Sequence, residues 1–244
     1  MQNLQEKAKE LRRNTFSLAV KHKDTHIASA FSIIEILIAL YEEILKPQDR
    51  FILSKGHGCF SFYAILREKG YNPKISGHPD ADPKNGICCT TGSLGHGFPI
   101  GVGMALAKKI KKEDGKIYVL IGDGECQEGT IWESLKIACH HKLNNLIAIM
   151  DHNKLQALDK IENILSLGNL KNKFEAFGWY VSEIDGHNLK EIISALEKNT
   201  GPCQPHMIIA HTIKGKGLSF MENDPKWQSR FPNPDELKKA YEEI

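Results

Sequence analysis

Residues 116–155 constrain the fold most, because this stretch has the pattern of two buried strands joined by a helix. Residues 117–121 are apolar and rich in β-branched side chains, as expected of a strand covered on both faces. Residues 130–141 carry apolar side chains at helical spacing, and residues 146–150 form a second apolar run. Strands connected in this way run parallel through a right-handed crossover, so the stretch predicts a parallel α/β sheet.

Polar residues follow both of these predicted strands. Asp123 stands between Gly122 and Gly124 after the first strand, and Asn153 follows the second. In open α/β sheets, ligands bind beside the carboxyl ends of the strands. A carboxylate and an amide oxygen suit Mg²⁺, which takes few protein ligands and lets phosphate oxygens complete its shell. The two glycines also let backbone N–H groups approach a phosphate, so the pattern predicts a metal–diphosphate site.

The Gly-Asp-Gly turn also has a simpler interpretation, a glycine-rich turn before a helix with a solvated aspartate. Other nucleotide-binding motifs fit less well. The chain has no G-x-x-x-x-G-K-[ST] motif, which argues against a P-loop NTPase. Residues 92–97, G-S-L-G-H-G, come nearest to a dinucleotide-binding fingerprint but lack the apolar strand that should precede it.

Composition narrows the class of protein further. The chain has 244 residues and a formal net charge of +2, which predicts neither a nucleic acid nor an anionic membrane as partner. No apolar run is long enough for a membrane span, and the amino terminus has no signal-peptide core. The 6 cysteines show no zinc-binding or C-x-x-C spacing, which favours a reducing, cytoplasmic location.

Strands and helices alternate along the rest of the chain, which favours a doubly wound, mostly parallel sheet flanked by helices. We expect residues 1–244 to form a single domain of this α/β class. The predicted helices are residues 4–20, 31–45, 59–69, 189–198 and 235–243, and the further predicted strands are residues 50–54, 179–184 and 206–210.

The segment G-D-G-E-C-Q-E-G-T-I-W-E, followed by D-H-N-K-L-Q, resembles the thiamine diphosphate motif of the transketolase family. Four shorter motifs strengthen the resemblance, which spans about residues 4–227. They are the segment around His26, L-S-K-G-H around His57, G-H-P-D around His78, and T-G-S-L-G-H-G with Gly92 and Leu94. The resemblance implies a thiamine diphosphate-binding fold, in which this chain is the diphosphate-binding domain.

The family assigns roles to the matching positions. Asp123, Asn153 and the carbonyl of Leu155 would hold Mg²⁺, with Ca²⁺ or Mn²⁺ as possible substitutes. His26, His57 and His78 would donate hydrogen bonds and exchange protons near the substrate, while Glu128 would join a polar network toward the partner. The residues expected to contact thiamine diphosphate are His57, Gly92, Leu94, Gly122, Asp123, Gly124, Glu125, Asn153, Leu155 and Lys214.

Transketolases also need a carboxylate on the aminopyrimidine, which a second domain supplies, and this sequence shows no such domain. The resemblance therefore implies one subunit of a split transketolase that transfers a two-carbon ketol unit from a ketose, or ketose phosphate, to an aldose. Activity would require a C-terminal partner subunit that carries the pyrimidine-binding domain, in an α2β2 heterotetramer.

Two alternatives remain open at this point. The α-subunit of a 2-oxo acid dehydrogenase shares the Gly-Asp-Gly turn and the split architecture, although Q-E-G-x-x-W-E, G-H-P-D and L-S-K-G-H favour transketolase. A non-catalytic regulatory relative is the other alternative. Gln228 stands where the family has a histidine after Trp227, and glutamine cannot carry a proton or a positive charge.

Overall fold

The computed structural model describes residues 1–244 and contains five strands and ten α-helices. None of the helices is both long and apolar enough to cross a lipid bilayer. The strands are β1 (Arg50–Leu53), β2 (Ile117–Gly122), β3 (Leu146–His152), β4 (Tyr180–Asp185) and β5 (His206–His211). The helices are α1 (Gln2–His22), α2 (Ile27–Phe31), α3 (Ile34–Ala39), α4 (Cys59–Glu68), α5 (Gly97–Lys111), α6 (Gly129–His140), α7 (Ile161–Leu165), α8 (Leu170–Ala176), α9 (Leu189–Glu197) and α10 (Pro234–Glu243).

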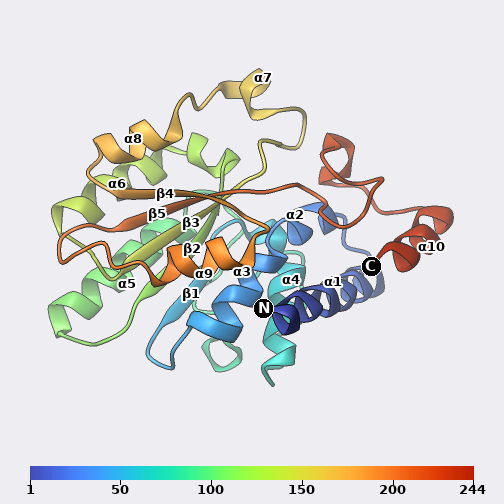
Figure 1. Ribbon diagram of the computed structural model, residues 1–244, viewed down its shortest axis with the longest axis horizontal. Helices are drawn as coiled ribbons and strands as arrows, with labels where there is room; N and C mark the ends of the chain where they lie inside the picture. Colours follow the sequence, from blue (N-terminus) through green and yellow to red (C-terminus); the bar gives the residue numbers. More distant parts are fainter.

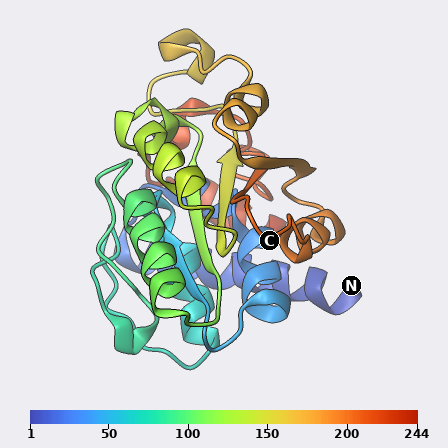
Figure 2. The same ribbon diagram turned by 90° about the vertical axis from the view of Figure 1, so that its left-hand side faces the viewer.

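All five strands belong to one parallel sheet with the order β1-β2-β3-β5-β4. Helices cover both faces, as Figures 1 and 2 show, so the predicted doubly wound α/β fold is confirmed. Helix α6 connects β2 to β3 on one face. The connection from β4 to β5 runs back across the sheet, and a right-handed crossover in that direction places α9 on the other face.

Strand side chains alternate between two apolar cores. Ile147 and Ile149 belong to the core beneath α1, α3, α4 and α9. Ala148 and Met150 belong to the core beneath α5, α6 and α8. This arrangement explains why the strand sequences are apolar at nearly every position, since a strand buried on both faces has no solvent-facing side.

Close approach of α5 to the sheet depends on its small residues. A Cβ atom on Gly101 would lie 2.4 Å from Cγ2 of Val119 in β2. Gly97, at the start of α5, would place a Cβ atom 2.6 Å from the hydroxyl of Ser54. These two glycines therefore let α5 lie close to β2 and to Ser54, which follows β1.

The predicted continuous helix over residues 31–45 is wrong. The chain instead forms α2, a break at residues 32–33, α3, and a π-helical turn over Leu40–Ile44. At the break, the hydroxyl of Ser32 lies 2.7 Å from the carboxylate of Asp151 at the end of β3. The interruption therefore joins the amino-terminal helices to the functional edge of the sheet, which apolar periodicity alone could not reveal.

Candidate functional site

A cavity of about 170 Å³ opens beside the carboxyl ends of β1, β2, β3 and β5. Residues that lie far apart in the sequence meet there because parallel strands end at the same edge. The lining residues are Ser29, Lys55, His57, Leu94, Gly122, Asp123, Gly124, Glu125, Asn153, Leu155, Gln156, Ala157, Lys214 and Gln228.

Asp123 is buried directly after β2 and begins the short 3₁₀ helix Gly124–Gln127. Its Oδ1 accepts a hydrogen bond from the backbone N of Gly124 at 2.8 Å. Its Oδ2 accepts from the backbone N of Lys154 at 2.6 Å and lies 3.1 Å from Nδ1 of His152. These donors fix the carboxylate while Oδ1, with a single hydrogen-bond donor, keeps a lone pair that could bind a hard cation.

Asn153 and Leu155 follow β3 on the same rim. The Oδ1 atom of Asn153 accepts from the backbone N of Leu155 at 3.0 Å. The Nδ2 atom of Asn153 donates to the carboxylate of Asp151 at 3.1 Å. Because the Nδ2 atom of Asn153 points toward Asp151, its Oδ1 atom is the one available to bind a cation.

A buried ion pair that the sequence analysis missed lies beneath these residues. The Lys55 ammonium bonds the carboxylate of Asp151, and their side chains are 1% and 0% exposed. Thr212 and Ser32 also donate to this carboxylate. Burial raises the pKa of Asp151, but Lys55 and these donors outweigh it, so the net pKa lies below the ordinary range.

Lys214, unlike Lys55, is a buried cation without an acidic partner. Its side chain is buried, its ammonium bonds the side-chain oxygen of Gln228, and it forms no ion pair with an acid. Burial, together with the nearby Lys55 charge, lowers the pKa of Lys214 to about 8. A buried cation without an acidic partner is poorly solvated, so an anion placed in the cavity would stabilise it.

The three predicted histidines meet at the mouth of the cavity. The His26 ring lies 6.0 Å from the His57 ring and 6.2 Å from the His78 ring, between centroids. His57 lines the cavity, whereas His26 and His78 lie beside it. Burial, followed by the charges of Lys55 and Lys214, lowers the pKa of His57 well below its usual value. His57 is therefore neutral at pH 7 and can donate one hydrogen bond and accept another.

Gly92 and Glu125 support the cavity wall. Gly92 has φ 139°, and a Cβ atom there would lie 3.1 Å from the ring of His78. The carboxylate of Glu125 accepts from the backbone N of Gly95 at 2.8 Å, from that of Gly122 at 3.1 Å, and from the hydroxyl of Ser54. Burial raises the pKa of Glu125 despite these bonds. Glu125 thus borders the cavity, and its carboxylate ties the loops together.

Glu128 lies outside the cavity, at the start of α6, and is exposed to solvent. A Cβ atom on Gly95 would lie 2.7 Å from Cβ of Glu128, so the side chain borders the loop that carries Leu94. Within this chain, Glu128 has no contact that would make it catalytic. Its predicted role toward a partner remains a prediction.

The donors around the cavity fit a diphosphate. The Oγ atom of Ser29 and the Nε2 atom of Gln156 are buried at the lining without a hydrogen-bond partner. Unpaired buried polar groups are costly, and phosphate oxygens would satisfy both of them. No group of three or more His, Cys, Asp or Glu side chains could hold a metal ion. A Mg²⁺ ion would therefore need phosphate oxygens in addition to Asp123 and Asn153.

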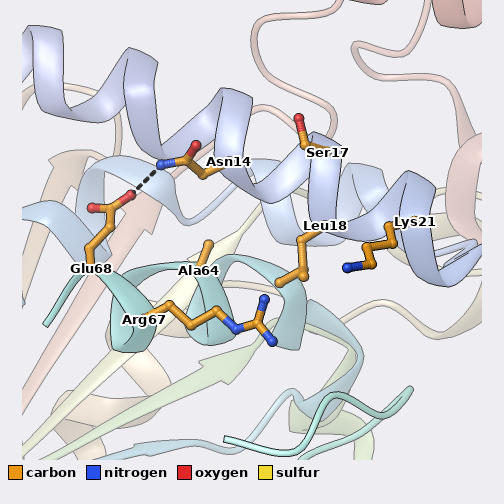
Figure 3. A pocket seen from close by; sticks show the side chains of 7 residues that line it. All are labelled: Asn14, Ser17, Leu18, Lys21, Ala64, Arg67 and Glu68. Atoms are coloured by element: carbon orange, nitrogen blue, oxygen red, sulfur yellow. Dashed lines mark hydrogen bonds between the residues drawn. The ribbon is translucent and has the colours of Figure 1, made fainter. Parts of the chain in front are cut away.

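A second hollow, of about 420 Å³, lies between α1 and α4 (Figure 3). Asn14 and Glu68 bridge it with a hydrogen bond of 2.8 Å. It holds none of the residues predicted for the site and no buried unpaired donor. Its lining is Asn14, Ser17, Leu18, Lys21, Ala64, Arg67 and Glu68.

The parallel α/β sheet has an aspartate, an amide and a cation-rich cavity at its carboxyl edge. This combination is typical of a diphosphate-binding domain. The family model for the transketolase, thiamine diphosphate binding domain matches residues 5–229. The chain belongs to the transketolase family, as the sequence motifs predicted.

Several relatives are similar over nearly their whole length. One of them, a subunit of the apulose-4-phosphate transketolase of Actinobacillus succinogenes, is 39% identical over 263 residues, covering 99% of this chain and 95% of that protein. The 6-deoxy-6-sulfo-D-fructose transketolase subunit SqwG of a Clostridium species is 41% identical over 242 residues, covering 90% and 88%. These relatives do not favour the 2-oxo acid dehydrogenase alternative.

A solved structure, the transketolase of Campylobacter jejuni, superposes with a TM-score of 0.88 and 31% sequence identity. The match covers 99% of this chain and 42% of that transketolase. This chain therefore spans less than half the length of that solved transketolase, and it corresponds in length to the relatives named as subunits.

Proposed function

We propose that this chain is the diphosphate-binding subunit of a split, thiamine diphosphate-dependent transketolase that moves a two-carbon ketol unit from a ketose to an aldose. The observation that carries the proposal is the cavity itself. Lys214 has no acidic partner there, and the buried Ser29 hydroxyl and Gln156 amide have no hydrogen-bond partner. All three are groups that an anion would satisfy, at the sheet edge where ligands of this fold class bind.

Asp123, Asn153 and the carbonyl of Leu155 would hold Mg²⁺, with Ca²⁺ or Mn²⁺ as substitutes. The fixed Asp123 carboxylate and the orientation of the Asn153 amide support this assignment. His57, Lys214 and the turn from Gly122 to Gly124 would contact the diphosphate. Gly92 and Leu94 would approach the aminopyrimidine.

Thiamine diphosphate, when bound, supplies the nucleophilic carbon and the electron sink for cleavage of a carbon–carbon bond. The side chains of this chain bind, orient and exchange protons. His26, His57 and His78 would face the hydroxyl groups of the sugar, where a neutral imidazole can take up a proton and return it. The buried Lys214 ammonium would hold negative charge where electrostatic interactions are stronger than in bulk water.

The partner would be a C-terminal subunit that carries the pyrimidine-binding domain, in an α2β2 assembly. Two relatives that are themselves named as subunits of apulose-4-phosphate transketolases support the need for a partner. Glu128 is exposed beside the cavity loops, where it could contact that subunit. All six cysteines are free thiols, which supports the proposed cytoplasmic location.

The ketose is proposed to be anionic. Two relatives are named for apulose-4-phosphate and for 6-deoxy-6-sulfo-D-fructose, which carry a phosphate and a sulfo group. Gln228 occupies the position where the family has a histidine, and it bonds Lys214. This substitution lies at the cavity, so we expect it to affect the choice of substrate.

Calorimetric titration of thiamine diphosphate with Mg²⁺, into this chain alone and into its complex with the partner subunit, tests the proposal. We expect Mg²⁺-dependent binding to the complex, and ketol transfer only by the complex. Asp123→Asn should abolish the Mg²⁺ dependence, while the control Asp114→Asn, an exposed acid before β2, should not. No binding by a correctly folded complex would refute the proposal, and oxidative decarboxylation of pyruvate would favour the dehydrogenase alternative.

A further inference from the structure

Lys214 lies in the loop that follows β5, and its position depends on the backbone around it. Its ammonium is held only by Gln228, a neutral side chain. We propose that Arg12, Glu35 and His187, none of which lines the cavity, act together as a clamp that positions Lys214 over the diphosphate site. This inference rests on the proposed function and names residues that are not among the predicted site residues and do not line the cavity.

Glu35 and Arg12 form the first half of the clamp. An oxygen of Glu35, in α3, accepts from the Arg12 guanidinium, in α1, at 2.7 Å, and both side chains are nearly fully buried. The Nε atom of the same guanidinium donates to the backbone carbonyl of Lys216 at 2.9 Å. Gly217 permits this contact, because its φ is 98° and a Cβ atom there would lie 2.7 Å from Cδ of Arg12. Arg12 therefore holds the loop on the carboxyl side of Lys214.

His187 forms the second half. Its Nδ1 atom lies 2.9 Å from the other oxygen of Glu35. The backbone N of Ile213 donates to Nε2 of His187 at 2.8 Å. A backbone N–H can only donate, so Nε2 carries no proton and Nδ1–H donates to Glu35. His187 therefore holds the loop at Ile213, immediately before Lys214.

The two anchors bracket the lysine. One carboxylate, that of Glu35, orients both Arg12 and His187, and these hold the backbone at residues 216 and 213. The backbone N of Gly215 adds a bond of 3.0 Å to the carbonyl of Ala28. His187 follows β4 and contacts the loop that carries Lys214, a residue of the cavity lining. His187 is thus a positioning residue that acts through Lys214.

Hydrogen exchange and cofactor binding test this inference separately. The variants are His187→Ala, His187→Gln, Lys214→Ala and the double variant His187→Ala/Lys214→Ala. Glutamine keeps an acceptor for Ile213 and a donor for Glu35. His211→Ala is the matched control, because His211 ends β5, just before the loop that carries Lys214, and its side chain bonds the exposed Glu183 and not Glu35.

Exchange of the amides of residues 212–217 is measured on the chain alone, without any ligand. We expect His187→Ala to accelerate it about tenfold, His187→Gln to restore most of the protection, and His211→Ala to leave it unchanged. Unchanged exchange in His187→Ala would refute the clamp. This measurement does not depend on the proposed function.

Affinity for thiamine diphosphate is measured on the complex with the partner subunit. We expect His187→Ala to weaken binding about tenfold in the wild-type background and less than about twofold in the Lys214→Ala background, because the effect passes through Lys214. An equal loss in both backgrounds would show that His187 supports the fold without positioning Lys214, and would refute the inference. If the wild-type complex bound no thiamine diphosphate, the proposed function would fail while the exchange result would stand.

Discussion

Replacing Asp151 with asparagine tests whether the buried Lys55–Asp151 ion pair beneath the cavity stabilises the fold. The carboxylate of Asp151 is fully buried and accepts from Lys55, Ser32, Thr212 and Asn153. Asparagine keeps one acceptor oxygen but turns an NH₂ group toward these donors and leaves the Lys55 ammonium without a counter-charge. Removing one partner of a buried ion pair costs about 3–5 kcal/mol.

A loss of stability of this size should be easy to measure. For a domain of this length, each kcal/mol corresponds to about 2–4 °C in Tm, so Asp151→Asn should lower Tm by roughly 6–20 °C. Urea denaturation followed by circular dichroism gives the free energy of unfolding directly. As a control, Glu175→Gln removes the exposed pair with Lys171 and should cost less than about 0.5 kcal/mol.

The double variant Asp151→Asn/Lys55→Met decides between a charge effect and a packing effect. If the uncompensated ammonium causes the loss, removing it should recover about 2 kcal/mol relative to the sum of the single variants. Additivity within about 0.5 kcal/mol, or an Asp151→Asn loss below about 1 kcal/mol, would refute the argument.

Three further predictions follow from the geometry of the site and its support. Gly101→Ala should destabilise the chain by about 1–3 kcal/mol in urea denaturation, because its Cβ atom would overlap Val119. The control Gly103→Ala adds a Cβ atom that meets no atom within 4 Å and should stabilise α5 by about 0.5–1 kcal/mol, so equal effects of the two variants would contradict the packing. Affinity of the complex for thiamine diphosphate should fall as pH rises through about 8, because Lys214 loses its charge there, and this fall should vanish in Lys214→Gln. Chelation of divalent cations should weaken cofactor binding to the wild-type complex and change little in Asp123→Asn; equal sensitivity in both would remove Asp123 from the metal site.

The sheet could be predicted because its signals are local. Each strand is an apolar run of a few residues, and alternation with helices leaves few parallel arrangements. The residues that follow the strand ends, Asp123 and Asn153, were predictable for the same reason. The order β1-β2-β3-β5-β4 places both of them at one edge, as the pattern of the first crossover indicated.

The Lys55–Asp151 pair could not be predicted with the same ease, because its residues meet only after the sheet has formed. Lys55 follows the end of β1, and the pairing of β1 with β2 and of β2 with β3 brings it to the end of β3. One signal was available. Asp151 follows Ile147 and Ile149 at alternate positions, so its side chain points into the same buried face. An acid on a buried face needs a partner, but the pattern does not say which one.

The charges around the cavity favour an anion, such as the diphosphate of the proposed cofactor, at this edge of the sheet. Asp151 neutralises Lys55, and His57 is neutral because burial and nearby cations lower its pKa. Lys214 is left as a buried cation without an acid, and the clamp at residues 213 and 216 fixes it in place. A divalent cation on Asp123 would add a second positive charge to the same cavity. Both charges would attract an anion in the cavity, whereas a neutral ligand would leave the buried Lys214 ammonium without an ionic partner.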